Sequence, residues 1–244
     1  MHAPHEPRLA RVAALMADAA RSRMLAYLLA GHYASAGELA RAASISASTA
    51  SGHLAQLSAG GLLVCEARGR HRYYKLADAE VAHALQALAL VAERHAHEHA
   101  WSAPARRRLR FARCCYGHLA GRLGVALLDA LQSTGRLTAV DGRYALTTDG
   151  QAWLESVGLE RAPARRGGTA AGPIDAGYPC LDWSERRDHL AGPLATRLLA
   201  HFIAQGWLAP IAARGPAPAS RALRLTPSGR NALGSLLGSA IDLG

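Results

Sequence analysis

The sequence predicts a mainly α-helical protein of the α+β class with small β-hairpins, on three observations. Apolar residues recur at helical spacing in several long stretches. Short alternating segments flank turns that contain glycine, which indicates hairpins. The chain has 244 residues, of which 50% are hydrophobic, enough for two domains with real cores. We expect an N-terminal domain over residues 1–101 and a C-terminal domain over residues 102–244.

Two short helices are predicted between residues 35 and 59. Ser35 and Glu38 have the spacing of a capping box that begins the first helix, and Ser46 can cap the second. Two short helices joined by a tight turn predict a helix-turn-helix. The predicted inward-facing residues are Leu39 and Ala40 in the first helix, and Ala50, Leu54 and Leu57 in the second.

The second of these helices, which we call the reader helix, is rich in short polar side chains on its outward face. Such side chains can approach base edges in the major groove of DNA without steric conflict. An ordinary solvated helix face can have the same composition. The candidate DNA-contacting residues of the reader helix are Ser46, Ser48, Thr49, Ser51, His53 and Gln56.

A basic β-hairpin is predicted directly after the reader helix. Residues 62–66 and 72–76 are predicted to be strands, and Gly69 lies at the turn between them. The tip is positively charged and can straddle a phosphate backbone. Its basic residues are Arg68, Arg70, His71 and Arg72. A basic hairpin after a helix-turn-helix favours DNA binding.

Three motifs in residues 8–100 carry a family resemblance. They are S-x-S-T-x-S-x-H-L-x-x-L (46–57), GGLL (60–63) and R-G-R-x-R-Y-Y-x-L (68–76). Through them the segment resembles the ArsR/SmtB family of bacterial winged-helix repressors. The resemblance implies a homodimer built on the first helix and on the helix after the hairpin. It also implies an inverted-repeat operator in double-stranded DNA, with the hairpin as the wing, and repression relieved by an effector.

The resemblance also implies that metal sites of two kinds should be sought. The thiolate kind needs a Cys-x-Cys motif in the helix before the reader helix, and residues 37–44, GELARAAS, contain no cysteine. The other kind uses carboxylate and imidazole ligands on the helix after the hairpin, where His95 and Glu98 lie one turn apart. A solvated, histidine-rich helix end explains this pair more simply, because imidazolium complements the helix dipole.

The charge of the chain is strongly positive and unevenly distributed. The formal net charge is +10 and the isoelectric point about 10.2, which favours a polyanionic partner, above all nucleic acid. Residues 1–100 hold 10 basic and 8 acidic residues, whereas residues 101–244 hold 18 and 10. The basic excess therefore cannot be assigned to the helix-turn-helix.

A segment that begins with His-Leu-Ala-Gly, which we call the repeated phrase, occurs twice in the C-terminal half of the sequence. Residues 118–137 and 189–208 share nine identities in 20 positions, and both have apolar residues at helical spacing. Each is followed by a hairpin-like stretch that closes on a similar motif, LTTDGQAWL or LTPSGRNAL. We interpret this as a duplicated helix and hairpin half-module about a pseudo-two-fold axis. The copies span about residues 107–155 and 180–238.

The sequence around the repeat predicts how the copies are connected. Residues 155–179 are rich in Gly, Pro, Ala and Arg and predict a linker, while Gly121 and Gly192 predict a close approach of two helices. The motifs C-Y-x-H-L-A-G and C-L-D-W-S-E-R-R-x-H-L-A-G resemble the C-terminal extension of a subgroup of ArsR-like regulators. Neither copy has a Ser/Thr-rich reader helix, so we expect effector sensing here.

Cysteine and histidine occur together in each copy. Cys115 lies three residues before His118, which on a helix puts both side chains on one face. In the second copy Cys180 lies nine residues before His189. A pseudo-two-fold arrangement would bring these four around one cavity. The candidate aromatic walls are Tyr116, Tyr178 and Trp183.

Three interpretations of this group remain open. Buried cysteines and histidines can simply fill the core. The group can instead line a pocket for an apolar or aromatic effector, with Cys115, Tyr116, His118, Cys180, Trp183 and His189 as sensing residues. Finally, the thiols and imidazoles can bind Zn or Cu(I), or Cys115 can be oxidised toward Cys114 or Cys180.

The sequence argues against an enzyme, a membrane protein and a secreted protein. It contains no Walker loop, no Gly-x-Ser-x-Gly and no His-Glu-x-x-His, and it indicates no required cofactor. The apolar N-terminal stretch is broken by Arg11, Asp18, Arg21 and Arg23, unlike a signal peptide or membrane span. We expect a cytoplasmic protein with four free thiols. The alternative function is an architectural DNA-binding protein that senses nothing.

Overall fold

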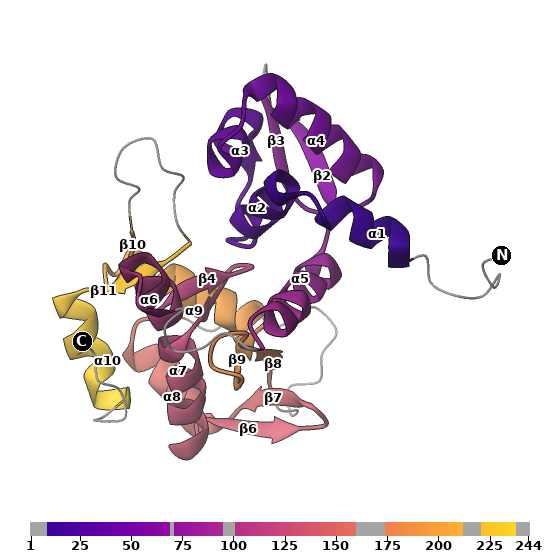
Figure 1. Ribbon diagram of the computed structural model, residues 1–244. Coiled ribbons are helices and arrows are strands. Elements are labelled where there is room, and N and C mark those ends of the chain that lie inside the picture. Colours follow the sequence, from indigo (N-terminus) through magenta and orange to yellow (C-terminus); the bar gives the residue numbers. More distant parts are fainter. Residues whose placement is uncertain (1–8, 69–70, 95–100, 160–173, 212–220, 238–244) are drawn as a thin grey trace. The chain divides into compact units, whose positions relative to one another are not determined.

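The chain folds into two compact units in the computed structural model, which describes residues 9–68, 71–94, 101–159, 174–211 and 221–237 (Figure 1). The N-terminal unit comprises residues 1–85 and 212–221, and the C-terminal unit comprises residues 86–211 and 222–244. The sequence predicted a boundary at residue 101, whereas the division falls within helix α5 (Ala79–Ala92).

The end of α5 belongs to the C-terminal unit because two arginines of that unit hold it. Arg106 Nη2 lies 2.7 Å from the Glu93 carboxylate, and Arg186 Nη2 donates to the carbonyl of Arg94 at 2.5 Å. Both contacts lie beyond the reach of a local sequence pattern.

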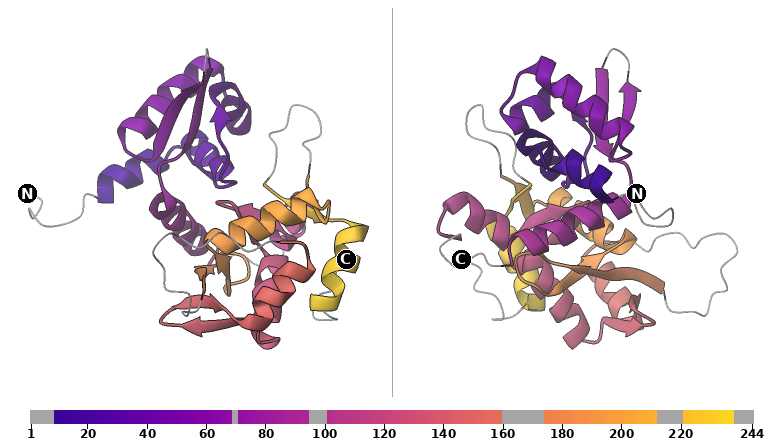
Figure 2. Two further views of the ribbon diagram at one scale, coloured as in Figure 1. Left: turned by 180° about the vertical axis from the view of Figure 1, so that it is seen from behind. Right: turned by 45° about the vertical axis from the view of Figure 1, so that its right-hand side comes forward.

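The N-terminal unit contains helices around a small sheet. Its helices before α5 are α1 (Leu9–Met16), α2 (Ala19–Leu28), α3 (Ala36–Ala43) and α4 (Ala47–Ala59). Its strands are β1 (Ala34–Ser35), β2 (Leu63–Arg68) and β3 (His71–Leu76), paired antiparallel in the order β1-β3-β2. Both views in Figure 2 show β2 and β3 projecting as a ribbon beside α4.

The predicted helix-turn-helix is formed by α3 and α4. Ser35 and Glu38 make the capping box in both directions, so that prediction is confirmed. Ser44 ends α3 in the left-handed conformation with φ 56°, which turns the chain toward α4. The predicted inward-facing residues are all buried: Leu39, Ala40, Ala50, Leu54 and Leu57. They form a core with Met24, Leu25 and Leu28 of α2.

The C-terminal unit alternates hairpins and helices. After α5 its helices are α6 (Pro104–Phe111), α7 (Arg122–Ser133), α8 (Thr148–Ser156), α9 (Pro193–Ala204) and α10 (Pro227–Leu237). Its strands are β4 (Arg113–Cys115), β5 (His118–Ala120), β6 (Leu137–Val140), β7 (Arg143–Leu146), β8 (Ile174–Leu181), β9 (Asp188–Ala191), β10 (Leu208–Pro210) and β11 (Leu223–Leu225). The order hairpin, helix, hairpin, helix therefore occurs twice.

The core of the C-terminal unit lies between α7 and α9. β6, β7, β8 and β9 form one antiparallel sheet in that order, and β4–β5 and β10–β11 form separate hairpins. The apolar residues predicted at helical spacing all belong to one buried cluster, as expected for facing helices. They are Leu123, Leu127 and Leu131 in α7, and Leu194, Leu198 and Phe202 in α9.

Three local predictions in this unit were wrong. The repeated phrase begins with a strand, because His118 lies in β5 and α7 starts only at Arg122. Residues 174–179 are not linker but strand, since β8 pairs with β7. Gly121 and Gly192 do not lie where α7 and α9 approach each other, because Gly121 lies against the end of α6 and Gly192 against β8. Each precedes a helix with positive φ, 82° and 103°, where the chain turns out of a strand.

Candidate functional site

Exposed hydroxyl groups cluster at the N-terminus of α4. Ser46 is the N-cap, and its Oγ accepts a hydrogen bond from the Thr49 N–H at 3.2 Å. The same oxygen lies 2.9 Å from Ser48 Oγ and 2.8 Å from Thr49 Oγ1. Ser51 is also exposed and donates to the Ala47 carbonyl. Ser46 thus stabilises the helix start, and the positive end of the helix dipole beside these hydroxyls suits an acceptor on DNA.

His53 and Gln56 lie on the side of α4 that faces α2. Arg21 of α2 donates to Gln56 Oε1 at 2.8 Å, and its Nη1 lies 3.3 Å from His53 Nδ1. Asp18 Oδ1 lies 3.9 Å from the other ring nitrogen of His53. These two predicted DNA-contacting side chains therefore have partners from α2 and its N-cap, whereas the hydroxyls at the start of α4 bond to one another and to the backbone of α4.

Three of the predicted basic residues, Arg68, His71 and Arg72, are described in the β2–β3 hairpin and are exposed. Arg68 is paired with Glu66 at 3.0 Å and its guanidinium stacks 4.4 Å from the Tyr33 ring, so this arginine is partly engaged. Arg72 is exposed and lines the same groove as Ser51, between α3, α4 and the hairpin. Arg70 lies outside the described residues. The helix and the hairpin thus present polar and basic side chains to one groove.

Two hairpins of the C-terminal unit bring the predicted cysteines and histidines together. Cys115 and His118 are directly opposite each other in β4–β5, and Cys180 and His189 are directly opposite in β8–β9. Opposite residues in an antiparallel pair share one face, with Cβ atoms about 5 Å apart. The sequence placed Cys115 and His118 on one face of a helix, which was wrong. The hairpin achieves the same proximity because Tyr116 and Gly117 both have positive φ, as a tight two-residue turn requires.

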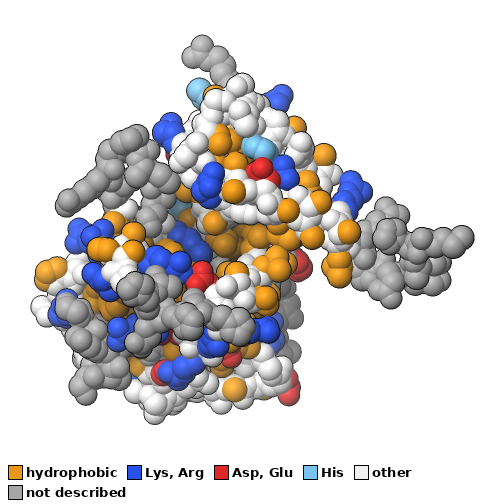
Figure 3. Space-filling model, viewed as in Figure 1, with side chains coloured by type: hydrophobic (Ala, Val, Ile, Leu, Met, Phe, Trp, Pro, Cys, Tyr) orange, Lys and Arg blue, Asp and Glu red, His pale blue; other side chains and the backbone are white. Residues whose placement is uncertain are grey.

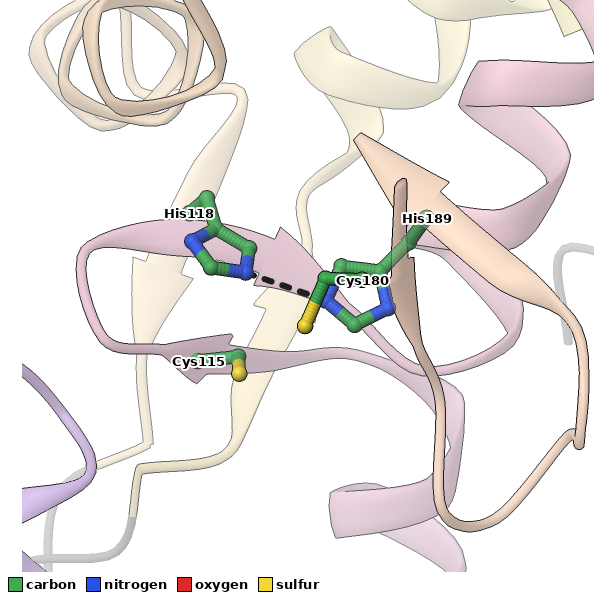
Figure 4. Close-up of side chains that lie close together, drawn as sticks. All are labelled: Cys115, His118, Cys180 and His189. Atoms are coloured by element: carbon green, nitrogen blue, oxygen red, sulfur yellow. Dashed lines mark hydrogen bonds between the residues drawn. The ribbon is translucent and has the colours of Figure 1, made fainter. Parts of the chain in front are cut away.

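The four side chains form a compact, buried cluster, which we call the Cys/His cluster (Figure 4). Their ligand atoms all lie within 4.8 Å of one another. His118 Nε2 and His189 Nε2 are 3.1 Å apart. None of the four is more than 6% exposed, and all the cysteines of the protein are free thiols. Figure 4 shows both sulfur atoms directed toward the space beside the two imidazole rings.

A fully buried ion pair lies beside the cluster. Asp182 Oδ1 accepts from Arg113 Nη2 at 2.7 Å, and both side chains have no exposed surface. Asp182 Oδ2 accepts from the Gly121 N–H at 2.7 Å and lies 3.4 Å from His189 Nδ1. A further hydrogen bond comes from the Ser184 N–H. Asp182 is therefore held rigidly, with one oxygen directed toward a cluster histidine.

The pKa values in the cluster are displaced by these contacts. A hydrogen bond from the Cys180 thiol lowers the pKa of Cys115 well below its usual value, and the same contact raises the pKa of Cys180. Burial opposes the charged form of His189, but its contacts with Asp182 and Cys115 outweigh burial and raise its pKa. Burial of Asp182 is likewise outweighed by His189 and Arg113, which hold its pKa well below the usual range. Cys115 is thus the more acidic thiol.

The aromatic residues predicted around the cluster have different neighbours. Tyr178 packs against Cys115 and Cys180, as expected for a wall of the cluster. Trp183 instead stacks on Trp101 at 5.6 Å and lies under the Arg113 guanidinium. Tyr116 is half-buried in the β4–β5 turn. The weaker metal-ligand candidates, His95 and Glu98, lie outside the described residues.

Three side chains that organise these sites were missed by sequence reasoning. Arg21 ties α2 to α4, and Arg113 and Asp182 form the ion pair under the cluster. Arg113 and Asp182 are 69 positions apart, and no local spacing connects them. The only available signal was that Asp182 and Arg113 each flank the cysteines of the repeated phrase.

Among the helices described, none is both long and apolar enough to cross a membrane.

Comparisons with known proteins agree with the geometry of the N-terminal unit. Residues 16–66 match the model of a helix-turn-helix domain. The chain is 35% identical over 224 residues to the HTH-type transcriptional regulator YdfF of Bacillus subtilis (strain 168), which covers 92% of this chain and 94% of that protein.

Two solved structures are also similar to part of this chain. One is a homodimeric winged helix-turn-helix domain of Mb0332 from Mycobacterium bovis, a possible ArsR-family regulator, at 30% identity. The alignment covers 40% of this chain and 96% of that one, with a TM-score of 0.34. Another is the cadmium metal-sensor CMTR from Mycobacterium tuberculosis, at 38% identity, 32% and 81% coverage and a TM-score of 0.29.

The similarity to YdfF extends over nearly the whole length of both chains, and the matched domain coincides with α2, α3, α4 and the start of the hairpin. The protein therefore belongs to the family of helix-turn-helix transcriptional regulators.

Proposed function

We propose that the protein is a homodimeric repressor of the ArsR type. It binds an inverted-repeat operator and is released when the C-terminal unit binds an effector. The observation that carries the proposal is the groove between α3, α4 and the hairpin, which Ser51 of α4 and Arg72 of the hairpin both line. Short hydroxyl side chains for base edges and arginine for phosphates are the two components that a major-groove reader needs.

Exposed apolar side chains on α1 and α5 support a dimer. Leu9 in α1 is 72% exposed, and Leu88 and Val91 in α5 are 46% and 55% exposed. Leu88 and Val91 are three positions apart and share a helix face. Figure 3 shows apolar side chains gathered over both helices. Large apolar side chains exposed at helical spacing are typical of a surface covered by a partner, and a two-fold dimer matches an inverted repeat.

The C-terminal unit supports a sensing role because it buries a group of charged and polar side chains in its interior. Arg113, Asp182, His118 and His189 all lie in its interior. Burying charged and polar groups is costly unless they are paired, and such groups are often retained for a function. The proposal assigns binding to this cluster and no catalytic step.

The experiment that tests the proposal is selection of DNA sequences by the purified full-length protein, followed by binding measurements on the selected site. We expect an inverted repeat. Ser48→Ala and Ser51→Ala should change base preference, by about 1–3 kcal/mol for each lost base contact. Arg72→Ala should weaken binding to all sequences alike and reduce the salt slope by about 1.

Arg187→Ala is the matched control, because Arg187 is an exposed arginine of the C-terminal unit paired with Asp129. It should leave both affinity and preference unchanged. Unaltered preference in the serine variants would remove the reader assignment. Selection of no sequence at all, with binding lost at raised salt, would favour the architectural DNA-binding protein instead.

A further inference from the structure

The Cys/His cluster has the composition and placement of a metal site. Each of two hairpins contributes one cross-strand Cys–His pair, and the four ligand atoms meet in one buried place (Figure 4). We propose that these four side chains bind a thiophilic divalent metal ion of the Zn²⁺ type in tetrahedral coordination. Two thiolates and two imidazoles are a preferred ligand set for that ion.

The distances within the cluster suit this coordination. Zn–S bonds of about 2.3 Å and Zn–N bonds of about 2.0–2.1 Å place tetrahedral ligand atoms roughly 3.3–3.8 Å apart. The two Nε2 atoms are already 3.1 Å apart, and no pair of ligand atoms exceeds 4.8 Å. An ion can therefore be enclosed by side-chain shifts of about 1 Å, without rearranging either hairpin.

The histidines are oriented so that Nε2 serves as the ligand atom. Asp182 Oδ2 lies on the Nδ1 side of His189, 3.4 Å away, which favours a proton on Nδ1 and leaves a lone pair on Nε2. A carboxylate behind a histidine is the usual outer partner of a metal-bound imidazole. In the metal-free cluster the Nε2–H of His118 then donates to His189 Nε2, and the ion replaces this hydrogen bond.

Charge balance favours a divalent ion over a monovalent one. Asp182 and Arg113 neutralise each other beside the cluster. Two thiolates carry two negative charges, which M²⁺ cancels and Cu⁺ leaves half uncompensated in a buried place. Binding replaces the two thiol protons, which leave to solvent, so the step balances as M²⁺ + 2 RSH giving M(SR)₂ + 2 H⁺.

Simple packing and a disulfide explain less of the arrangement. Packing accounts for buried sulfur, but not for two imidazole nitrogens that face each other beside two thiols. A Cys115–Cys180 disulfide would use the two sulfurs and leave both histidines without a role. Metal binding uses all four side chains and the carboxylate behind them.

The assignment of this ion as the effector rests on the proposed function, whereas metal binding itself does not. The test is therefore made without DNA. Reduced, chelator-treated full-length protein is titrated with Co²⁺ and its absorption spectrum recorded, and Zn²⁺ affinity is then measured by competition with a chromophoric chelator. We expect one ion per chain, intense tetrahedral Co²⁺ bands with thiolate charge transfer, and their loss when Zn²⁺ is added.

The matched pair of variants is Cys115→Ala and Cys114→Ala. The two cysteines are adjacent in β4 and both buried, but Cys114 belongs to the apolar core between α7 and α9, on the other face of the strand. Cys115→Ala should weaken Zn²⁺ binding by more than the roughly 10–100-fold lost with an outer partner. Cys114→Ala should bind as the wild type does.

Folding of each variant is checked by circular dichroism, and His118→Gln serves as a second ligand deletion if Cys115→Ala does not fold. Weak octahedral Co²⁺ bands, or equal Zn²⁺ affinity in the wild type and in a folded ligand variant, would overturn the proposal. Mass spectrometry that finds Cys115 and Cys180 joined in the protein able to bind Zn²⁺ would overturn it as well.

Discussion

Arg113 and Asp182 show how single residues shape the C-terminal unit. Their ion pair is fully buried, and Asp182 also accepts hydrogen bonds from the Gly121 and Ser184 N–H groups. Only glycine fits at position 121, for two reasons. Its φ is 82°, and a Cβ there would lie 2.5 Å from the Arg110 carbonyl oxygen. The pair thus joins the β4 strand, the start of α7 and the segment after β8.

Removing the carboxylate of Asp182 should be costly. Asp182→Ala leaves the Arg113 charge buried without its carboxylate, and we expect a loss of about 3–5 kcal/mol in the free energy of unfolding. The control is Asp129→Ala, which breaks a 2.7 Å pair with Arg187 whose members are 44% and 62% exposed. Exposed pairs contribute about 0–1 kcal/mol. Urea unfolding measures both values, and equal losses would contradict the role given to Asp182.

For the residues of the Cys/His cluster, the sequence predicted correctly that they lie together but assigned Cys115 and His118 to a helix instead of a hairpin. The repeat in the sequence led to the prediction that four side chains lie together, and they do: Cys115, His118, Cys180 and His189. The prediction extended the helical period of α7 back to Cys115, although α7 begins only at Arg122. It did not recognise the two-residue turn that begins at Tyr116. The ion pair could not be predicted, since its partners come from segments with no shared period.

Among the secondary-structure elements, α3 and α4 were the most predictable because their signals are local. Ser35 and Glu38 form a reciprocal capping box at the start of α3, and the Ser46 side chain accepts the Thr49 N–H at the start of α4. Such caps depend only on residues three positions apart. β8 was not predicted, because its pairing with β7 is distant in the sequence and the strand carries a glycine and a proline.

The capping box of α3 predicts a pH dependence. The backbone N–H of Ser35, and then its hydroxyl, lower the pKa of Glu38 below 4.5. Stability from this carboxylate is therefore full above pH 4.5 and is lost as the pH falls through the lowered value. We expect Glu38→Gln to be less stable than the wild type at neutral pH, with the difference shrinking in acid. Thermal unfolding measured across this range checks it, and a difference that grows in acid would contradict it.

The exposed face of α5 predicts the oligomeric state. Val91→Glu places a charge where the proposed dimer buries an apolar side chain, so the protein should become monomeric and lose operator affinity. Ile203→Glu on α9 is the control, because Ile203 is 38% exposed and has no place in the proposed interface. Sedimentation equilibrium distinguishes the two variants. A dimer that survives Val91→Glu, or a monomeric wild type, would exclude this face as the interface.

At the scale of the whole molecule, the proposed DNA-contacting features and the buried polar features are divided between two units. The reader helix and hairpin lie in the N-terminal unit, whereas the Cys/His cluster lies in the C-terminal unit. Helix α5 belongs to both and carries the exposed apolar residues of the proposed dimer. A ligand that changes the equilibrium of the C-terminal unit can thus act on the dimer, provided that it binds the free and DNA-bound states differently.

The measurement that tests this account most directly is the release of operator DNA by Zn²⁺. A fluorescent operator, chosen by sequence selection, is bound by the metal-free full-length protein, and its anisotropy is followed as Zn²⁺ is added. The account predicts release at one ion per chain for the wild type and Cys114→Ala, and continued binding for Cys115→Ala. Release that is the same in all three proteins, or continued binding by wild type whose Co²⁺ spectrum shows an occupied site, would contradict it.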